Sequence, residues 1–191
     1  SSCHLQMICV VASASCLLLA LRPTLGAPVH ISGAGRSSVG TVKVRLAGTN
    51  EYSGGWAGGP DISICGDMLL DKINREQTQL PGYELEIHWW NSECSANGAL
   101  KSVSEAYFNN TRFLGHIGGA CSGGSMAVAE FAQRQMIPQI AFSAKASALS
   151  DRATYKYFFR AIGPDDQAAK AWARAFFELS WRHVALVRQT N

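Results

Sequence analysis

Segments with the pattern of a β-strand alternate with segments with the pattern of an α-helix along most of this chain. The strand segments are short and rich in β-branched or aromatic residues, and the helix segments carry apolar residues at spacings of three and four. We expect strands over residues 41–48, 83–90, 112–119, 137–143, 157–160 and 183–187, and helices over residues 62–76, 96–108, 125–135 and 165–179. Such alternation is typical of βαβ units with parallel strands. The sequence therefore predicts an α/β fold in which helices flank a parallel sheet.

The composition is that of a folded domain. Hydrophobic residues make up 47% of the 191 residues and charged residues 16%, a balance that favours a packed core over disorder. The formal net charge of +3 is small, and no cluster of Lys and Arg is interleaved with aromatic residues. We therefore expect no nucleic-acid partner.

The N-terminal segment has the features of a secretory signal peptide. An uncharged apolar block runs from Ile8 to Leu21, and small residues follow it. A block of about fourteen residues is too short to span a bilayer comfortably but suits the core of a signal peptide. We expect a signal peptide over residues 1–27 and a leader rich in Gly and Ser over residues 28–40. A buried helix or strand is the alternative for the apolar block.

Removal of this segment would leave three of the six cysteines, Cys65, Cys94 and Cys121. Cys94 follows one predicted strand and Cys121 the next, so both should lie at the same edge of the sheet and are the favoured disulfide pair. Closing that loop would stabilise the fold by about 3–4 kcal/mol in the chain-entropy model. Cys65 falls on the apolar side of a predicted helix and is expected to be a small buried hydrophobe with an unpaired thiol. No Cys or His pair has the spacing of a zinc site, and no metal or cofactor is expected.

The loops that follow the predicted strands indicate where a ligand would bind. In parallel sheets, ligands lie outside the carboxyl ends of the strands. The loops at that edge span residues 49–60, 91–95, 119–125 and 143–155 and are rich in Gly, Ser and Asn. In the glycine-rich stretch from Gly118 to Ser125, the free N–H groups of a helix N-terminus would face a bound anion. We therefore expect anion binding there.

Catalysis at the same loop is disfavoured. The stretch from Gly119 to Gly123 matches a nucleophile elbow with Cys121 as the attacking residue, but that chemistry needs an acid and then a histidine downstream. His183 is the only later histidine, and it opens a predicted strand. The phosphate-binding motifs G-x-G-x-x-G and G-x-x-x-x-G-K-[ST] do not occur. The sequence favours a protein that is not an enzyme and has no catalytic residue.

Three further residues stand out in predicted loops. Trp56 has glycines on both sides, and a large aromatic on such a loop more often covers a ligand than packs in a core. Lys145 follows the fourth strand among small residues, where a solvated lysine and a ligand-binding lysine are both possible interpretations. Asn109 begins the sequon Asn-Asn-Thr and would be glycosylated in a secreted chain.

Several motifs of this chain resemble a known family. They are Ser-Gly-Gly-Trp at residues 53–56, Leu-Pro-Gly-Tyr-Glu-Leu at 80–85, Cys94, Cys-Ser at 121–122, Ala-Leu-Ser-Asp-Arg at 148–152 and Phe-Phe-Arg at 158–160. In this order they resemble the ligand-binding region of the metabotropic GABA type-B receptors. More broadly, they resemble the type I periplasmic-binding-like domain (the ANF-receptor family) of class C G-protein-coupled receptors. The resemblance extends from about residue 42 to residue 191.

The resemblance implies a two-lobed clamp on the extracellular side of the plasma membrane. Such a clamp closes on a small amino-acid-like or acidic ligand, dimerises through lobe 1, and signals through a G protein by way of a membrane portion. Residues 41–180 would form lobe 1, and residues 181–191 the first strand of a truncated lobe 2. The alternatives are a soluble solute-binding protein of a transporter and the ectodomain of a receptor guanylate cyclase.

The resemblance also assigns site residues. Trp56 and Ser122 fall on positions that line the agonist pocket in the family, and the family disulfide falls on Cys94 and Cys121. The chain departs from the family at the next pocket segment, where Ser143 replaces a glycine, Lys145 a ligand-contacting serine and Ile162 a histidine. The expected ligand-binding set is Trp56, Ser122, Ser143 and Lys145.

Overall fold

The computed structural model describes residues 41–56, 58–108 and 112–185. The predicted signal peptide (1–27), the leader (28–40) and the sequon at Asn109 lie outside the described residues and stay predictions. The strands are β1 (Val42–Asn50), β2 (Tyr83–Asn91), β3 (Gly115–Ile117), β4 (Gln139–Ala141) and β5 (Phe158–Arg160). The helices are α2 (Gly59–Glu76), α3 (Ala96–Phe108), α4 (Ser122–Arg134), the short 3-10 helix η1 (Ser147–Ser150) and α5 (Asp165–Glu178).

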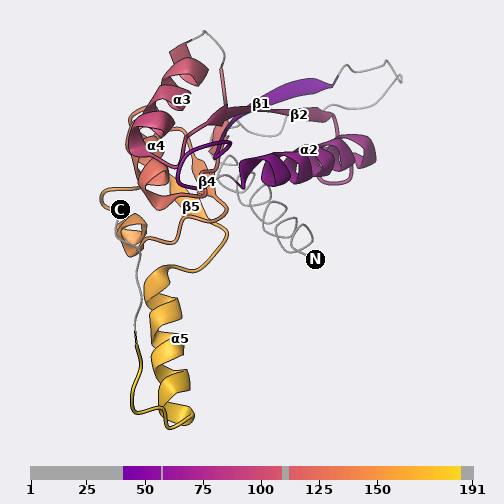
Figure 1. Cartoon of the computed structure of the whole chain (residues 1–191). Coiled ribbons are helices and arrows are strands. Elements are labelled where there is room, and N and C mark those ends of the chain that lie inside the picture. Colours follow the sequence, from indigo (N-terminus) through magenta and orange to yellow (C-terminus); the bar gives the residue numbers. More distant parts are fainter. Residues whose placement is uncertain (1–40, 57, 109–111, 186–191) are drawn as a thin grey trace.

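The five described strands form one parallel sheet in the order β2-β1-β3-β4-β5 (Figure 1). β1 is central to the register, because Leu46 pairs with Ile87 of β2 on one side and with Gly115 of β3 on the other. All carboxyl ends point to the same edge of the sheet. The predicted α/β fold with a parallel sheet is confirmed.

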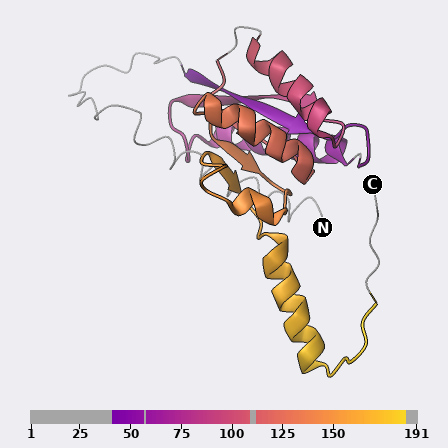
Figure 2. The same cartoon turned by 90° about the vertical axis from the view of Figure 1, so that its left-hand side faces the viewer.

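Helices cover both faces of the sheet (Figures 1 and 2). α2 packs on one face, and α3 and α4 lie side by side on the other. The α2 face buries a cluster formed by Leu46, Ile62, Ile117, Ile140 and Phe142. On the opposite face, the next residue of β1, Ala47, packs with Ala106 and Phe113. The two-residue period of a strand thus sends neighbouring side chains of β1 into two separate cores.

β3 and β4 are shorter than the patterns predicted, with three residues each in place of 112–119 and 137–143. β3 ends where the backbone turns away at Gly118, whose φ is +106°. A side chain there would place Cβ 2.0 Å from the carbonyl oxygen of Thr49, so only glycine fits. The apolar runs extend beyond the ladder because some flanking residues, such as Phe113 and Phe142, are also buried.

α2 and α4 both begin about three residues earlier than expected. The sequence predicted the first helix from residue 62, but Gly58 is the N-cap and Asp61 lies in the first turn. Pro60 occupies the first turn, where its missing N–H leaves no helical hydrogen bond unmade. A carboxylate in that turn still interacts favourably with the helix dipole. α4 begins at Ser122 rather than at Ser125.

The C-terminal part of the described chain leaves the sheet. α5 buries none of its residues and extends away from the other elements (Figures 1 and 2). The strand expected from His183 is not formed over its described residues, since His183–Ala185 are exposed and pair with no described strand. A β-strand exists only through hydrogen bonds to a neighbour. Among the described residues, no helix is both long and apolar enough to cross a membrane.

Cys65 lies on the buried side of α2, as its place in the sequence predicted. The expectation of an unpaired thiol is wrong, because Cys65 is disulfide-bonded. A half-cystine and a small hydrophobe suit the same buried position, so the apolar pattern of the helix did not distinguish the two.

Polar side chains are buried beneath the carboxyl edge, on the face covered by α3 and α4. His116 of β3 is fully buried, and its Nε2 is hydrogen-bonded to Oγ1 of Thr49 at 3.0 Å. Its Nδ1 has no partner among the described residues. Burial lowers the pKa of His116 to about 3, because the charged form would lose its hydration. His116 is therefore a neutral core residue at physiological pH.

We predict that Leu46→Ala destabilises the fold by about 2–5 kcal/mol, because it opens a cavity between β1 and α2. Leu46 is 2% exposed, whereas Leu100 on α3 is 43% exposed. Leu100→Ala is the matched control and should change the free energy of unfolding by about 0.5 kcal/mol or less. Urea unfolding monitored by circular dichroism measures both, and equal effects of the two variants would contradict this core.

We also predict that His116 makes the fold sensitive to acid. The unfolded state takes up a proton below its ordinary pKa of 6.5, whereas folded His116 stays neutral down to about pH 3. Stability is therefore lost as the pH falls below about 6.5, at up to about 1.4 kcal/mol per pH unit.

His116→Gln should remove this contribution, so the difference in unfolding free energy between wild type and variant should change between pH 7 and pH 5. Val103→Ala, at a fully buried position without a titratable group, is the control, for which we expect a constant difference. A constant difference for His116→Gln as well would show that His116 is not held neutral.

Candidate functional site

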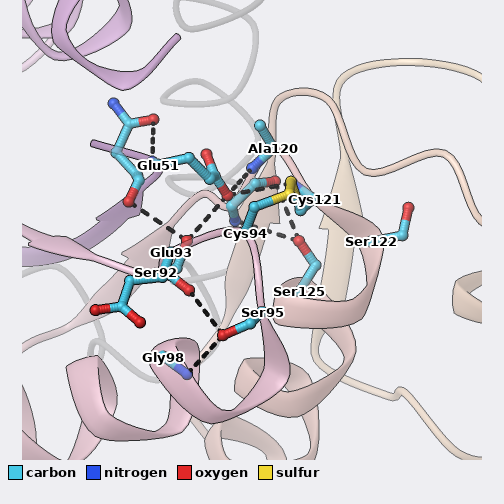
Figure 3. The surroundings of a disulfide bond; sticks show 12 residues. Glu51, Ser92, Glu93, Cys94, Ser95, Gly98, Ala120, Cys121, Ser122 and Ser125 are labelled. Atoms are coloured by element: carbon cyan, nitrogen blue, oxygen red, sulfur yellow. Dashed lines mark hydrogen bonds between the residues drawn. A yellow bond between two sulfur atoms is a disulfide. The ribbon is translucent and has the colours of Figure 1, made fainter. Parts of the chain in front are cut away.

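A disulfide joins two of the loops at the carboxyl edge of the sheet. Cys94 lies between β2 and α3, and Cys121 lies between β3 and α4. Their Cα atoms are 5.3 Å apart, which is within the usual range for a disulfide (Figure 3). The pairing that the sequence favoured, and that the family resemblance implied, is the one the structure contains.

Glu51 occupies the centre of this edge, directly after β1. Its side chain is 0% exposed. One carboxyl oxygen, Oε1, accepts hydrogen bonds from the N–H of Ala120 (2.9 Å), the N–H of Cys121 (3.2 Å) and the hydroxyl of Ser92 (3.1 Å) (Figure 3). A single side chain thereby connects the loops that follow β1, β2 and β3.

The glycine-rich loop is therefore used differently from what the sequence suggested. The N–H groups expected to meet an external anion at Ala120 and Cys121 already bind the carboxyl group of Glu51. Gly119 permits this approach, because a Cβ atom there would lie 2.9 Å from Glu51 Oε1. The expectation that this loop binds an external anion is therefore wrong for the N–H groups of Ala120 and Cys121.

Sequence reasoning missed Glu51, although a signal was present. The residue comes immediately after a strand that is buried along its second half, so a polar residue at that position needs partners inside the fold. Burial is the main cause that raises the pKa of Glu51, and the hydrogen bonds from Cys121, Ser92 and Ala120 oppose it. Its second oxygen, Oε2, is buried and has no partner among the described residues.

The donors beyond Cys121 remain available. Within the described part of the chain, the N–H groups of Ser122 and Gly123 have no hydrogen-bond acceptor. Gly123 is exposed, and a side chain there would meet nothing within 4 Å. The first turn of α4 thus presents open N–H groups next to the Glu51 contacts.

The hydroxyl of Ser122 joins α4 to the loop after β4. Ser122 Oγ accepts hydrogen bonds from the N–H of Lys145 (3.2 Å) and of Ala146 (3.1 Å). The structure therefore brings together two of the residues that the sequence analysis assigned to the ligand site, Ser122 and Lys145.

Arg160, the last residue of β5, holds the same loop from the other side. Its guanidinium donates to the carbonyl oxygens of Ala146 (3.0 Å) and Ala144 (3.5 Å) and to the hydroxyl of Ser150. These contacts explain why the Ala-Leu-Ser-Asp-Arg and Phe-Phe-Arg motifs occur together, because the second motif supplies the arginine that holds the segment around the first. The sequence analysis did not assign Arg160 a role.

Lys145 has a fixed backbone and an exposed side chain. Its N–H binds Ser122, and its carbonyl oxygen accepts a hydrogen bond of 2.9 Å from the N–H of Asp165. Its ammonium group forms no ion pair with a side chain in the described ranges. A cation on a fixed loop at this edge is suited to attract an anionic group.

Trp56 and Ser143 lie at the same edge but are less closely tied to it. The loop that carries Trp56 is anchored at its start, where Asn91 binds both the N–H of Tyr52 and the hydroxyl of Ser53. Trp56 itself is 41% exposed. Ser143 follows β4 and is half-buried.

The chemistry of the edge is that of a binding site. The sulfur of Cys121 is bonded to Cys94, so the nucleophile that an elbow mechanism would need is not a free thiol. No group of three His, Cys, Asp or Glu side chains among the described residues is arranged to hold a metal ion. The edge presents open N–H groups of α4, the hydroxyls of Ser122 and Ser143, the ammonium group of Lys145 and the exposed indole of Trp56.

The sequence of the chain matches one protein family and several known proteins. Residues 67–191 match the model of a family described as "Receptor family ligand binding region". The chain is 29% identical over 139 residues to the mouse gamma-aminobutyric acid type B receptor subunit 1, and identically so to the rat protein. It is 27% identical over 123 residues to subunit 2 of the rat receptor. These matches cover 73% and 64% of this chain, but only 14% and 13% of the relatives.

We predict that peptide mapping without reduction recovers Cys94 and Cys121 in one linked peptide. Replacing both residues by serine should destabilise the fold by about 3–4 kcal/mol, since the bond closes a loop of 27 residues in the unfolded chain. Ser104→Ala, at an exposed hydroxyl on α3, is a control that should have little effect. Recovery of Cys121 linked to any other cysteine would contradict the pairing.

Proposed function

Because this chain belongs to the family of receptor ligand-binding regions, we propose that it forms the ligand-sensing lobe of a class C G-protein-coupled receptor on the extracellular side of the plasma membrane. Residues 41–180 would be lobe 1, and the remainder would lead into a second lobe. The ligand would be a small amino acid or a related acid. The relatives are receptor subunits rather than enzymes, which agrees with a role in binding.

The observation that carries the proposed site is the pair of hydrogen bonds from the Lys145 and Ala146 N–H groups to Ser122 Oγ. They join the first turn of α4 to the loop after β4. The open N–H groups of α4 and the loop that carries Lys145 are therefore held next to each other. We assign the ligand's anionic group to Ser122, Gly123 and Lys145. Trp56 would cover the aliphatic part of the ligand, and Ser143 would line the pocket beside it.

The strength of such a site follows from its parts. The N-terminus of α4 favours an anion by roughly 0.3–1 kcal/mol, and a charge-assisted hydrogen bond from Lys145 adds about 1.5–3 kcal/mol where water is excluded. The exclusion of water would come from the second lobe and from Trp56. Lobe 1 alone would therefore bind weakly, because it supplies only part of the contacts.

Signalling would follow from closure of the two lobes. A ligand that contacts both lobes binds the closed state more tightly and shifts the population towards it by that difference in affinity. The relatives are numbered subunits of one receptor type, which supports assembly with a partner subunit. We assign the dimer contact to lobe 1. Transmission to a G protein would need the membrane portion of the receptor.

We predict that Lys145→Ala in the full-length receptor weakens an acidic agonist at least tenfold, the equivalent of about 1.4 kcal/mol. The probes are amino acids, including gamma-aminobutyric acid, each compared with its own carboxamide. The carboxamide has no charge at that end, so the variant should bind it about as well as the wild type does. Radioligand competition on membranes measures both.

Lys156→Ala is the matched control, because Lys156 is also an exposed loop lysine but lies outside the proposed site. It should leave both affinities unchanged. If Lys145→Ala changes the affinity for acid and amide equally, or changes neither, Lys145 does not bind the anionic group.

A further inference from the structure

We propose that Glu51 is a positioning residue for this edge: its buried carboxyl group takes the place of an external anion ahead of α4 and fixes the first turn of that helix. The role in ligand binding rests on the proposed function above, whereas the positioning itself does not. Glu51 is not part of any of the sequence motifs that resemble the family.

The contacts of Glu51 are concentrated on one atom at a point where three loops meet. Its Oε1 accepts from Ala120 N, Cys121 N and Ser92 Oγ, at 2.9, 3.2 and 3.1 Å. Two successive backbone N–H groups that converge on one oxygen form the kind of concave site that binds a carboxylate or phosphate in other proteins. Here the anion is part of the chain.

The backbone of Glu51 is held as firmly as its side chain. Its carbonyl oxygen accepts a hydrogen bond of 2.8 Å from Gly59 N at the start of α2, and its N–H donates to Asn50 Oδ1 at 3.0 Å. Gly59 and Gly119 both lie so close to Glu51 that a Cβ atom on either would approach one of its oxygens to 2.9 Å or less. Gly59 therefore makes room for the backbone of Glu51, and Gly119 for its side chain.

Ser122 directly follows Cys121 in the chain, so the contacts that hold Cys121 also determine where Ser122 lies. Cys121 donates its N–H to Glu51, and the next residue, Ser122, turns its hydroxyl towards Lys145 N and Ala146 N. Fixing Cys121 from Glu51 on one side and from the disulfide on the other leaves Ser122 little freedom to move. Glu51 thus acts on the loop that carries Lys145 without touching it.

The same contacts determine which donors a ligand can use. The N–H groups of Ala120 and Cys121 are occupied, so an incoming carboxylate is confined to Ser122, Gly123 and Lys145. A ligand with a second anionic group directed towards Ala120 would meet the carboxyl group of Glu51 instead of two open donors.

The test is chemical rescue of Glu51→Ala in the full chain. Removal of the carboxyl group leaves the two N–H groups without an acceptor and should lower the midpoint of thermal unfolding by at least about 5 °C. Sodium acetate should restore at least half of that loss, because acetate supplies the missing carboxylate. Sodium chloride at the same ionic strength should not.

Val128→Ala is the matched control, because Val128 is fully buried in α4 and packs against Ala99 and Val103 with no polar role. It should be destabilised, yet gain no more from acetate than the wild type does. Glu51→Gln keeps an acceptor oxygen. Its midpoint of thermal unfolding should therefore lie closer to that of the wild type than to that of Glu51→Ala. Failure of acetate to rescue Glu51→Ala, or equal rescue of Val128→Ala, would overturn the proposal.

Amide hydrogen exchange distinguishes a positioning role of Glu51 from a general loss of stability. Glu51→Ala should speed amide exchange in peptides that contain Lys145 and Ala146 at least several-fold, and acetate should slow it again. Val128→Ala should speed exchange at Lys145 and Ala146 no more than at the amides of α4. These measurements need no agonist, so they stand even if Lys145→Ala leaves agonist affinity unchanged.

Discussion

The carboxyl group of Glu51 is the contact on which the arrangement of the carboxyl edge depends. A buried carboxyl group is unfavourable unless hydrogen bonds replace its hydration, and here three donors converge on one oxygen. Those donors come from the loops after β2 and β3, while Glu51 itself follows β1. The need to satisfy one buried group therefore fixes three loops relative to one another.

The remainder of the edge is held by contacts of different chemical kinds. The disulfide between Cys94 and Cys121 is covalent, the hydroxyl of Ser122 binds two backbone N–H groups, and the guanidinium of Arg160 binds two carbonyl oxygens. Together they fix the backbone around Lys145 but leave its ammonium group exposed. A fixed backbone beneath an exposed charge is suited to binding, because little conformational freedom is lost when the ligand arrives.

The two ends of the described chain differ in how they are stabilised. From β1 to β5, each strand is paired and each long helix buries an apolar side against the sheet, whereas α5 buries no residue at all. Even the large apolar side chains of α5, such as Trp172 and Phe177, are exposed to solvent. The core side chains of the sheet, by contrast, are almost fully covered. The binding edge belongs to the first part, whose geometry the core determines.

The sequence by itself determined the fold class, the order of most strands and helices along the chain, and the Cys94–Cys121 disulfide, because periodicity and the placement of cysteines after strands are local features. It did not reveal the disulfide at Cys65. The sequence predicts full strands over residues 112–119 and 137–143 because apolar residues extend past the hydrogen-bonded ladder. It predicts a strand from His183 as well, although strand formation needs a partner. Only the tertiary structure decided the role of Glu51 and Arg160. Each acts on residues far away in sequence, Glu51 on Ala120 and Cys121, so no local pattern records the contact. The glycine loop shows the same division: its spacing predicted an anion, but only the packing of β1 beneath it determined that the anion belongs to the chain itself.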